Sequence, residues 1–257
     1  MDLSFIKELA LAAGQIGMKH FGRVRKKYKE DRSIVTDADL EIEAFLVERL
    51  SSRYPKHGIL AEETLTSISK KSSYAWAIDP VDGTQPFSFD FPLWSISIGF
   101  LVEGIPTMGV IYQPAIGDMY YGDPHGVFLN NRQLMPIEEA PLDEYSYLMV
   151  PESIHNSYVC SWKGDFLCVG SIAAHCCYVA RGCAVGMLSR PHIWDLAAGV
   201  ALMEPLGIHS RYLDGSDVKW TELYDGRRLP QPVLAARKSH WNELAASVVS
   251  WRTNEKQ

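Results

Sequence analysis

The sequence has no long apolar segment and little cysteine. No run reaches the roughly 18 apolar residues that a membrane-spanning helix needs, and the first residues, Met1-Asp2-Leu3-Ser4-Phe5, lack the basic stretch of a signal peptide. The five cysteines are odd in number and form no CxxC pair. We therefore expect reduced, mostly buried thiols in a cytoplasmic protein without a membrane segment.

An excess of positive charge is also missing. The formal net charge is −6, which argues against a nucleic-acid partner. A basic cluster runs from Arg23 to Lys29, but Glu30 and Asp31 follow at once, and we interpret it as a solvated helix end. The 257 residues, 47% of them hydrophobic, suffice for one large domain or two modest ones with an ample core.

Hydrophobic periodicity predicts an α/β protein built from two halves. Apolar residues at helical spacing predict a helix over residues 2–22, and Thr36 is suited to cap a second helix that continues to Arg53. Short β-type runs separated by Gly, Pro and Asn then indicate hairpins of an antiparallel sheet, whereas strands and helices alternate after about residue 140. We expect an α+β half over residues 1–140 and an α/β half over residues 141–257.

The remaining elements are predicted from the same patterns. The expected strands cover residues 58–61, 74–78, 94–102, 107–112, 118–122, 166–169, 184–188 and 233–236. The expected later helices cover residues 171–181, 194–203 and 239–251.

Two aspartates end the apolar run that begins at Trp76. Asp79 and Asp82 are three positions apart and are followed by Gly83 and Thr84. Buried carboxylates are costly unless a cation neutralises them, and two charges about 4 Å apart repel by roughly 4 kcal/mol at an effective dielectric of about 20. Carboxylate and carbonyl oxygens are ligands that Mg²⁺ prefers. This turn therefore predicts a metal site.

Other acidic residues also stand at element boundaries. Glu62-Glu63 closes a strand, Asp39 lies in the first turn of a helix, and Asp195 opens another helix. Taken singly, they are explained by an exposed loop, a capping box and the helix dipole. Taken jointly, they predict convergence on one cleft, where two ions could clamp the oxygens of a phosphoryl transfer. The small residues 197–199 would let the helix at Asp195 approach a neighbour closely.

In this arrangement the chain resembles the inositol monophosphatase family of Mg²⁺-dependent, lithium-sensitive sugar and polyol phosphatases. The resemblance covers residues 3–248 and implies a layered αβαβα sandwich, commonly a homodimer. The motifs that carry it are Val35-Thr36-Asp37-Ala38-Asp39 with Glu43, Ala61-Glu62-Glu63, Asp79-Pro80-Val81-Asp82-Gly83-Thr84, and Trp194-Asp195-Leu196-Ala197-Ala198-Gly199.

The resemblance also implies a role for each motif residue. One Mg²⁺ ion would be held by Glu62, Asp79 and the Val81 carbonyl, and a second by Asp79, Asp82 and Asp195. Glu62 would also face a third, weaker ion.

Catalysis and phosphate binding are implied in the same way. Asp39 and Thr84, with Glu62, would position or deprotonate the attacking water. The amides of Gly83 and Thr84 would hold the phosphate. The remaining substrate contacts would come from Gly170, Ser171, Ile172 and Asp195.

One departure from the family concerns substrate choice. Inositol-selective members often carry a glutamate seven residues before the last metal aspartate, and this chain has Leu188 there. Arg190 nearby could meet a carboxylate or second phosphate, or form a surface ion pair.

We therefore expect a phosphomonoesterase that acts on a small alcohol or polyol phosphate, nominally inositol 1-phosphate. Within the same class the alternatives are a 3′-phosphonucleotide, a histidinol-phosphate or a sugar-bisphosphate phosphatase. A non-catalytic regulatory partner protein is the alternative from a different class.

Overall fold

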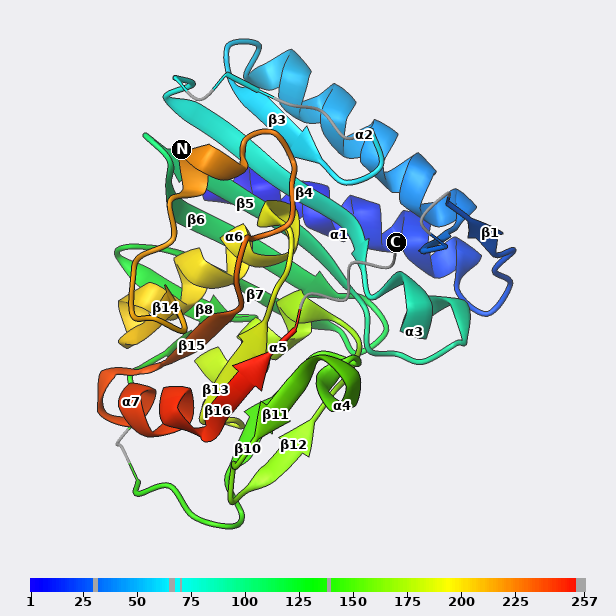
Figure 1. Cartoon of the computed structure of the whole chain (residues 1–257). Helices are drawn as coiled ribbons and strands as arrows, with labels where there is room; N and C mark the ends of the chain where they lie inside the picture. Colours follow the sequence, from blue (N-terminus) through cyan, green and yellow to red (C-terminus); the bar gives the residue numbers. More distant parts are fainter. Residues whose placement is uncertain (30–31, 65–67, 70, 138–139, 253–257) are drawn as a thin grey trace.

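A computed structural model of the chain describes residues 1–29, 32–64, 68–69, 71–137 and 140–252. In this part of the chain, helices and sheets alternate in layers (Figure 1), so the expected α/β class and αβαβα sandwich are confirmed. Helices α1 and α2 cover one face of a large sheet, and α5 and α6 lie between that sheet and a smaller one, which α7 covers. Apolar clusters fill the spaces between these layers, which is how packed layers exclude water.

The large sheet has the strand order β3-β4-β5-β6-β7-β8-β9 in the described chain. Strands β3 and β4 are parallel and the other neighbours are antiparallel, which confirms the predicted hairpins. The strands are β3 (Gly58–Ala61), β4 (Tyr74–Asp82), β5 (Ser95–Val102), β6 (Ile105–Gln113), β7 (Asp118–Asp123), β8 (Gly126–Leu129) and β9 (Arg132–Leu134).

The outer helices are α1 (Leu3–His20) and α2 (Asp37–Arg53), close to their predicted bounds. Their apolar faces pack on the large sheet around buried Trp76. Thr36 caps α2, and the side chain of Asp39 accepts a hydrogen bond from the Thr36 amide in return. The capping box that the sequence suggested is therefore present.

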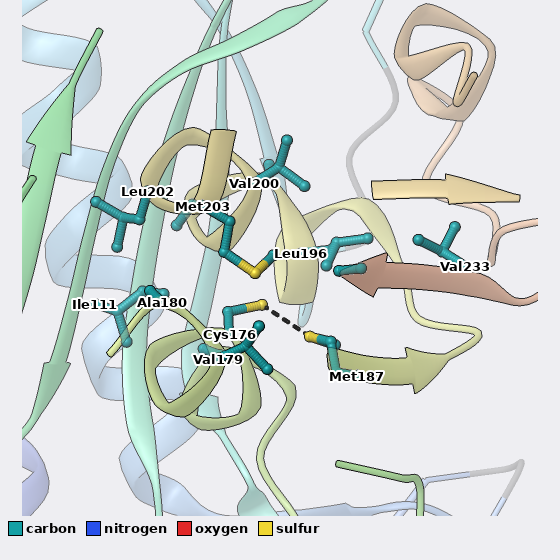
Figure 2. Packing of buried hydrophobic residues seen from close by; sticks show 14 of the residues in the cluster. Ile111, Cys176, Val179, Ala180, Met187, Leu196, Val200, Leu202, Met203 and Val233 are labelled. Carbon is teal, nitrogen blue, oxygen red and sulfur yellow. Dashed lines mark hydrogen bonds between the residues drawn. The ribbon is translucent and has the colours of Figure 1, made fainter. Parts of the chain in front are cut away.

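The inner helices are α5 (Ile172–Ala180) and α6 (Ile193–Met203). Their contact is close because α6 carries glycine there: a Cβ added to Gly199 would lie 2.2 Å from the Cys176 sulfur. The same sulfur lies 3.4 Å from that of Met187, and Figure 2 shows the apolar cluster around this pair. The close approach expected from residues 197–199 is confirmed.

The small sheet has the order β12-β10-β13-β15-β14. Strand β10 is parallel to β12 and β13, and the pairs that involve β15 are antiparallel. The strands and their covering helix are β10 (Tyr147–Met149), β12 (Asp165–Leu167), β13 (Gly186–Ser189), β14 (Ile208–Tyr212), β15 (Val233–Arg237) and α7 (Lys238–Ser247). Short helical segments occur at α3 (Thr84–Ser88), α4 (Ile154–Ser157), η1 (Glu204–Leu206) and η2 (Trp220–Leu223).

Three sequence predictions about this architecture are wrong. The last helix ends at Ser247, and β16 (Val248–Trp251) pairs instead with β11 (Tyr158–Cys160), because adjacent valines favour extended backbone. The basic cluster is not a helix end: α1 stops at His20, and β1 (Lys27–Tyr28) pairs with β2 (Ile34–Val35). The cysteines are not mostly buried, since two are exposed and one is intermediate.

None of the helices in the described residues is long and apolar enough to cross a membrane.

Candidate metal centre and active site

A cavity of about 560 Å³ opens where β3 and β4 end and α6 begins. It is lined by Lys29, Ser33, Glu62, Glu63, Asp79, Val81, Asp82, Gly83, Thr84, His192, Trp194, Asp195 and Arg228. Seven of these residues were given a metal-binding, catalytic or substrate-binding role from the sequence, and they come from three separate motifs of the chain. The structure thus brings these motifs together.

Asp79, Asp82 and Asp195 form the acidic centre of the cavity. One carboxylate oxygen from each lies within 4.8 Å of the others, a grouping that could hold a metal ion. In a regular strand, residues three apart point to opposite faces. Here the pairing of β4 with β5 shifts register between Asp79 and Asp82, with Pro80 inside the irregularity. This bulge lets both side chains reach the same cavity.

Glu62, at the end of β3, brings a fourth carboxylate to the cavity. Lys29 Nζ lies 3.3 Å from Glu62 Oε1 and 2.7 Å from Glu63 Oε1. Burial alone would lower the pKa of Lys29, but the two glutamates outweigh burial and raise it. The following loop is held by buried Glu43, whose carboxylate accepts hydrogen bonds from the amides of Glu63 and Thr64 at 2.7 and 2.8 Å.

Burial and mutual repulsion disfavour the charged forms of these acids. Burial, with the nearby Asp195, raises the pKa of Asp82 to about 7. Burial raises the pKa of Glu62 to about 8, although Lys29 opposes the shift. The pKa of Asp79 is raised well above its ordinary value by burial and by Glu62. A set of buried carboxylates with raised pKa values fits a bound cation, which would neutralise them.

Asp39 lies behind the cavity wall and is fully buried. Its Oδ2 accepts a hydrogen bond from the Thr36 amide at 2.8 Å, and its Oδ1 lies 3.0 Å from the Thr84 hydroxyl. The same hydroxyl lies 3.0 Å from the Val81 carbonyl oxygen. Burial raises the pKa of Asp39 to about 6 despite these donors. Thr84 therefore connects Asp39 to the cavity.

Gly83 occupies a left-handed conformation, with φ of 95°, where β4 ends and α3 begins. A Cβ at this position would lie 3.1 Å from the Gly170 carbonyl oxygen and 3.1 Å from the Ser171 Cβ. Glycine is therefore needed both for the backbone angle and for the close approach of the second segment.

The segment Gly170-Ser171-Ile172 lies outside the set that lines the cavity. The hydroxyl of Ser171 and the amide of Ile172 donate hydrogen bonds to Asp82, and the amide of Ala173 adds a third at 2.6 Å. Gly170 faces a separate shallow hollow beside Pro86. In this structure the segment holds Asp82 in place.

Arg190 and Leu188 also lie away from the cavity. Arg190 Nε donates to the Leu229 carbonyl at 2.8 Å, and its guanidinium stacks 5.8 Å from the Trp251 ring centre. Leu188 pairs with Leu234, which belongs to the cluster under α7, so the two share that face of the sheet. Neither side chain lines the cavity in this structure.

Sequence reasoning gave no role to four residues that line the cavity: Lys29, Ser33, His192 and Arg228. Lys29 was assigned to a solvated surface, and Arg228 belongs to no motif. His192 stands three residues before Asp195, so its closeness to the site could have been inferred from helix geometry. Its amide donates to Asp195 Oδ2 at 2.8 Å.

Comparison with known proteins gives one consistent result. A family model described as "Inositol monophosphatase family" matches residues 2–252. An inositol-1-monophosphatase of Synechocystis is 33% identical over 96% of this chain and 88% of its own length. A histidinol-phosphatase of Chlorobaculum parvum is 32% identical over 80% of this chain and 83% of its own length. The solved inositol monophosphatase of Anabaena superposes with a TM-score of 0.78 at 28% identity, covering 95% of this chain and 94% of that one.

Proposed function

The chain belongs to the inositol monophosphatase family, and we propose that it hydrolyses phosphate monoesters of small alcohols and polyols in a Mg²⁺-dependent reaction, with inositol 1-phosphate as the nominal substrate. One observation carries this proposal most directly. Carboxylates from β3, β4 and α6 converge on a single cavity, within reach of the Thr84 hydroxyl.

The donor set suits oxygen-seeking divalent ions. In the proposal Glu62, Asp79 and the Val81 carbonyl hold one Mg²⁺, and Asp79, Asp82 and Asp195 hold a second. Glu62 also faces a third, weaker site. Bound Mg²⁺ would supply Lewis-acid polarisation of the phosphate and make water a stronger nucleophile near neutral pH.

The protein's own contribution is positioning and proton transfer. Asp39 is the proposed proton acceptor, and Thr84 Oγ1, 3.0 Å away, links it to the cavity. A carboxylate whose pKa is raised by burial to about 6 is a better base at neutral pH than an ordinary one. The backbone amides of Gly83 and Thr84 are proposed to hold the phosphate.

Direct substrate contacts of Gly170, Ser171, Ile172 and Arg190 stay predictions from the family resemblance. The contacts seen here support a positioning role for Ser171 and Ile172 through Asp82. Asp195 is proposed to serve both metal and substrate, since it lines the cavity beside His192.

Partners and compartment follow as further proposals. We propose that the protein is a cytoplasmic homodimer and that its substrate is a small phosphate ester. The five free cysteines suit a reducing compartment, and sedimentation velocity would measure the oligomeric state.

Phosphate release from a substrate panel tests the proposal. The panel contains inositol 1-phosphate, glycerol 2-phosphate, histidinol phosphate, a 3′-phosphonucleotide and a sugar bisphosphate, each with Mg²⁺ and with chelator. We expect release that requires Mg²⁺, is inhibited by lithium and falls by orders of magnitude in Asp82→Asn. Release that survives chelation, or no release from any ester, would refute the proposed activity and leave the regulatory alternative.

A further inference from the structure

A loop over residues 224–232 contributes Arg228 to the lining of the cavity. It follows η2 and leads into β15, and it is part of the orange segment in Figure 1. Leu229 fixes this loop: its amide donates to the Pro191 carbonyl at 2.9 Å, its carbonyl accepts from Arg190 Nε at 2.8 Å, and its side chain is fully buried. The neighbouring residue, Arg228, is thereby held at the wall of the cavity.

His192 and Trp194 support Arg228 from the side of α6. Their rings stack with centres 4.7 Å apart and an interplanar angle of 11°. His192 Nδ1 lies 2.9 Å from the Gly226 carbonyl oxygen, so Nδ1 carries the proton in the neutral ring and Nε2 is free to accept. Arg228 Nε lies 3.3 Å from that Nε2. This hydrogen bond uses the Nε–H of Arg228. The two terminal NH2 groups of the guanidinium stay available to donate to another acceptor.

Arg228 differs from the two arginines nearest to it. Arg227 lies 3.6 Å from a carboxylate oxygen of Asp225 and donates to the Glu222 carbonyl. Arg190 donates to a carbonyl and stacks on an indole. Among the described residues, Arg228 has no carboxylate within ion-pair distance, although its cavity contains five of them. A guanidinium held at an acidic cavity without pairing to it is suited to an anion that comes from outside.

We propose that Arg228 is a specificity-determining residue that selects phosphate esters carrying a second anionic group, a phosphate or a carboxylate, on the alcohol portion. This inference rests on the proposed phosphatase function. The ester phosphate would lie at Gly83 and Thr84, and the second anion would lie against the His192–Trp194 wall. The planar guanidinium binds either anion through paired hydrogen bonds.

The size and polarity of the cavity support this substrate class. Its volume of about 560 Å³ is typical of pockets for small organic ligands. The side chain at the position of the family's polyol-binding glutamate, Leu188, lies under α7 and offers no acceptor for a neutral polyol. The cationic substrate histidinol phosphate would place its ammonium group beside a guanidinium, which like-charge repulsion disfavours.

The experiment compares kcat and KM across substrates in wild type, Arg228→Gln and Arg228→Lys. Glycerol 2-phosphate and inositol 1-phosphate represent neutral alcohols, fructose 1,6-bisphosphate a second phosphate, 3-phosphoglycerate a carboxylate, and histidinol phosphate a cation. We expect wild-type kcat/KM to be at least about 10-fold higher for the better doubly anionic ester than for glycerol 2-phosphate. Arg228→Gln should lose about 10- to 100-fold on that ester through KM, the usual effect of removing a charged hydrogen bond.

Arg228→Gln should change the neutral esters by less than about 3-fold, and Arg228→Lys should restore part of the lost preference. Arg227→Gln is the matched control, because Arg227 is adjacent but engaged outside the cavity, and it should behave as wild type.

The possible results separate this inference from the function on which it rests. Equal wild-type kcat/KM for neutral and doubly anionic esters would overturn the role of Arg228 and leave the phosphatase assignment intact. An equal loss on every substrate in Arg228→Gln would place Arg228 on the reacting phosphate and also overturn it. No phosphate release from any ester would refute the phosphatase function itself. The wild-type comparison can overturn the proposal even if the variants fail to fold.

Discussion

Asp79 and Asp82 share one cavity because β4 bulges between them. Sequence alone named these acids, together with Glu62, Asp195 and Thr84, because each stands at the end of an element and belongs to a motif. It did not find Lys29, His192 or Arg228. When a charged or aromatic residue lies outside a motif, the sequence alone does not predict that it lies near the site. Tertiary contacts place such residues here: the hydrogen bonds of Leu229, for example, position the neighbouring Arg228.

The side chain of Thr84 should act through its hydroxyl. We expect Thr84→Val to lower kcat by about 100-fold, the low end of general acid–base effects, because Asp39 loses its connection to the cavity. Thr84→Ser keeps the hydroxyl and should retain most activity. Steady-state kinetics at saturating Mg²⁺ measures both, and equal activity of the Val and Ser variants would contradict the proposed proton path.

Elements with long periodic patterns were predicted well. Helices α1 and α2 and strands β3 and β5 fall within two residues of expectation. Strands β8 and β9 were missed, although β8 is as long as β3. Strand β14 was missed although Ile208, Ser210 and Tyr212 alternate with more exposed residues. The partner strand of Val248–Trp251 is about 90 residues earlier in the chain, so local pattern could not reveal it. The division into halves at residue 140 stays a prediction.

The contact of α5 with α6 should be sensitive to one methyl group. Gly199→Ala places a Cβ against Cys176, and we expect a loss of about 1–3 kcal/mol in the free energy of unfolding, as for other overpacked cores. The Cys176 Cβ would also lie 2.5 Å from the added Cβ, so only a Cys176→Gly background removes both contacts, and there the loss should be less than half as large. Urea denaturation of the wild type, the two single variants and the double variant measures this coupling. An identical loss in both backgrounds would show that the Cys176 side chain is not what limits this approach.

Three layers of the molecule supply the acidic residues in and behind the cavity. Asp39 comes from an outer helix, Glu62, Asp79 and Asp82 from the large sheet, and Asp195 from an inner helix. Burial raises the pKa values of the first four. The fold therefore holds mutually repelling carboxylates close together, and a bound cation would relieve this repulsion. Ion binding should consequently raise the free energy of unfolding of the whole molecule.

The metal-free protein should lose stability as pH rises from about 6.5 to about 8. The folded-state pKa values of Glu62, about 8, and Asp82, about 7, exceed those of free carboxyls, near 4. The folded state thus binds more protons than the unfolded state in this range, and the stability that these protons provide is lost as pH rises through the folded pKa values. The lowered pKa values of His57 and His175 act in the opposite sense, because the unfolded state keeps their protons up to about pH 6.5, at the lower limit of this range.

Calorimetry in chelator should show Tm falling by at least about 3 °C across this window, the shift expected for about 1 kcal/mol at this chain length. Saturating Mg²⁺ should abolish the fall, because it favours the ionised carboxylates. A Tm in chelator that stays level or rises would contradict the buried acidic centre.

Titration of the metal-free protein with Mg²⁺ by calorimetry tests the central claim most directly. We predict saturable binding that weakens by at least about 10-fold in Asp79→Asn, because that carboxylate is assigned to both principal ions. Asp165→Asn, an exposed change on the edge strand β12, should leave the affinity unchanged. An absence of saturable binding, or equal affinity in wild type and Asp79→Asn, would contradict the account.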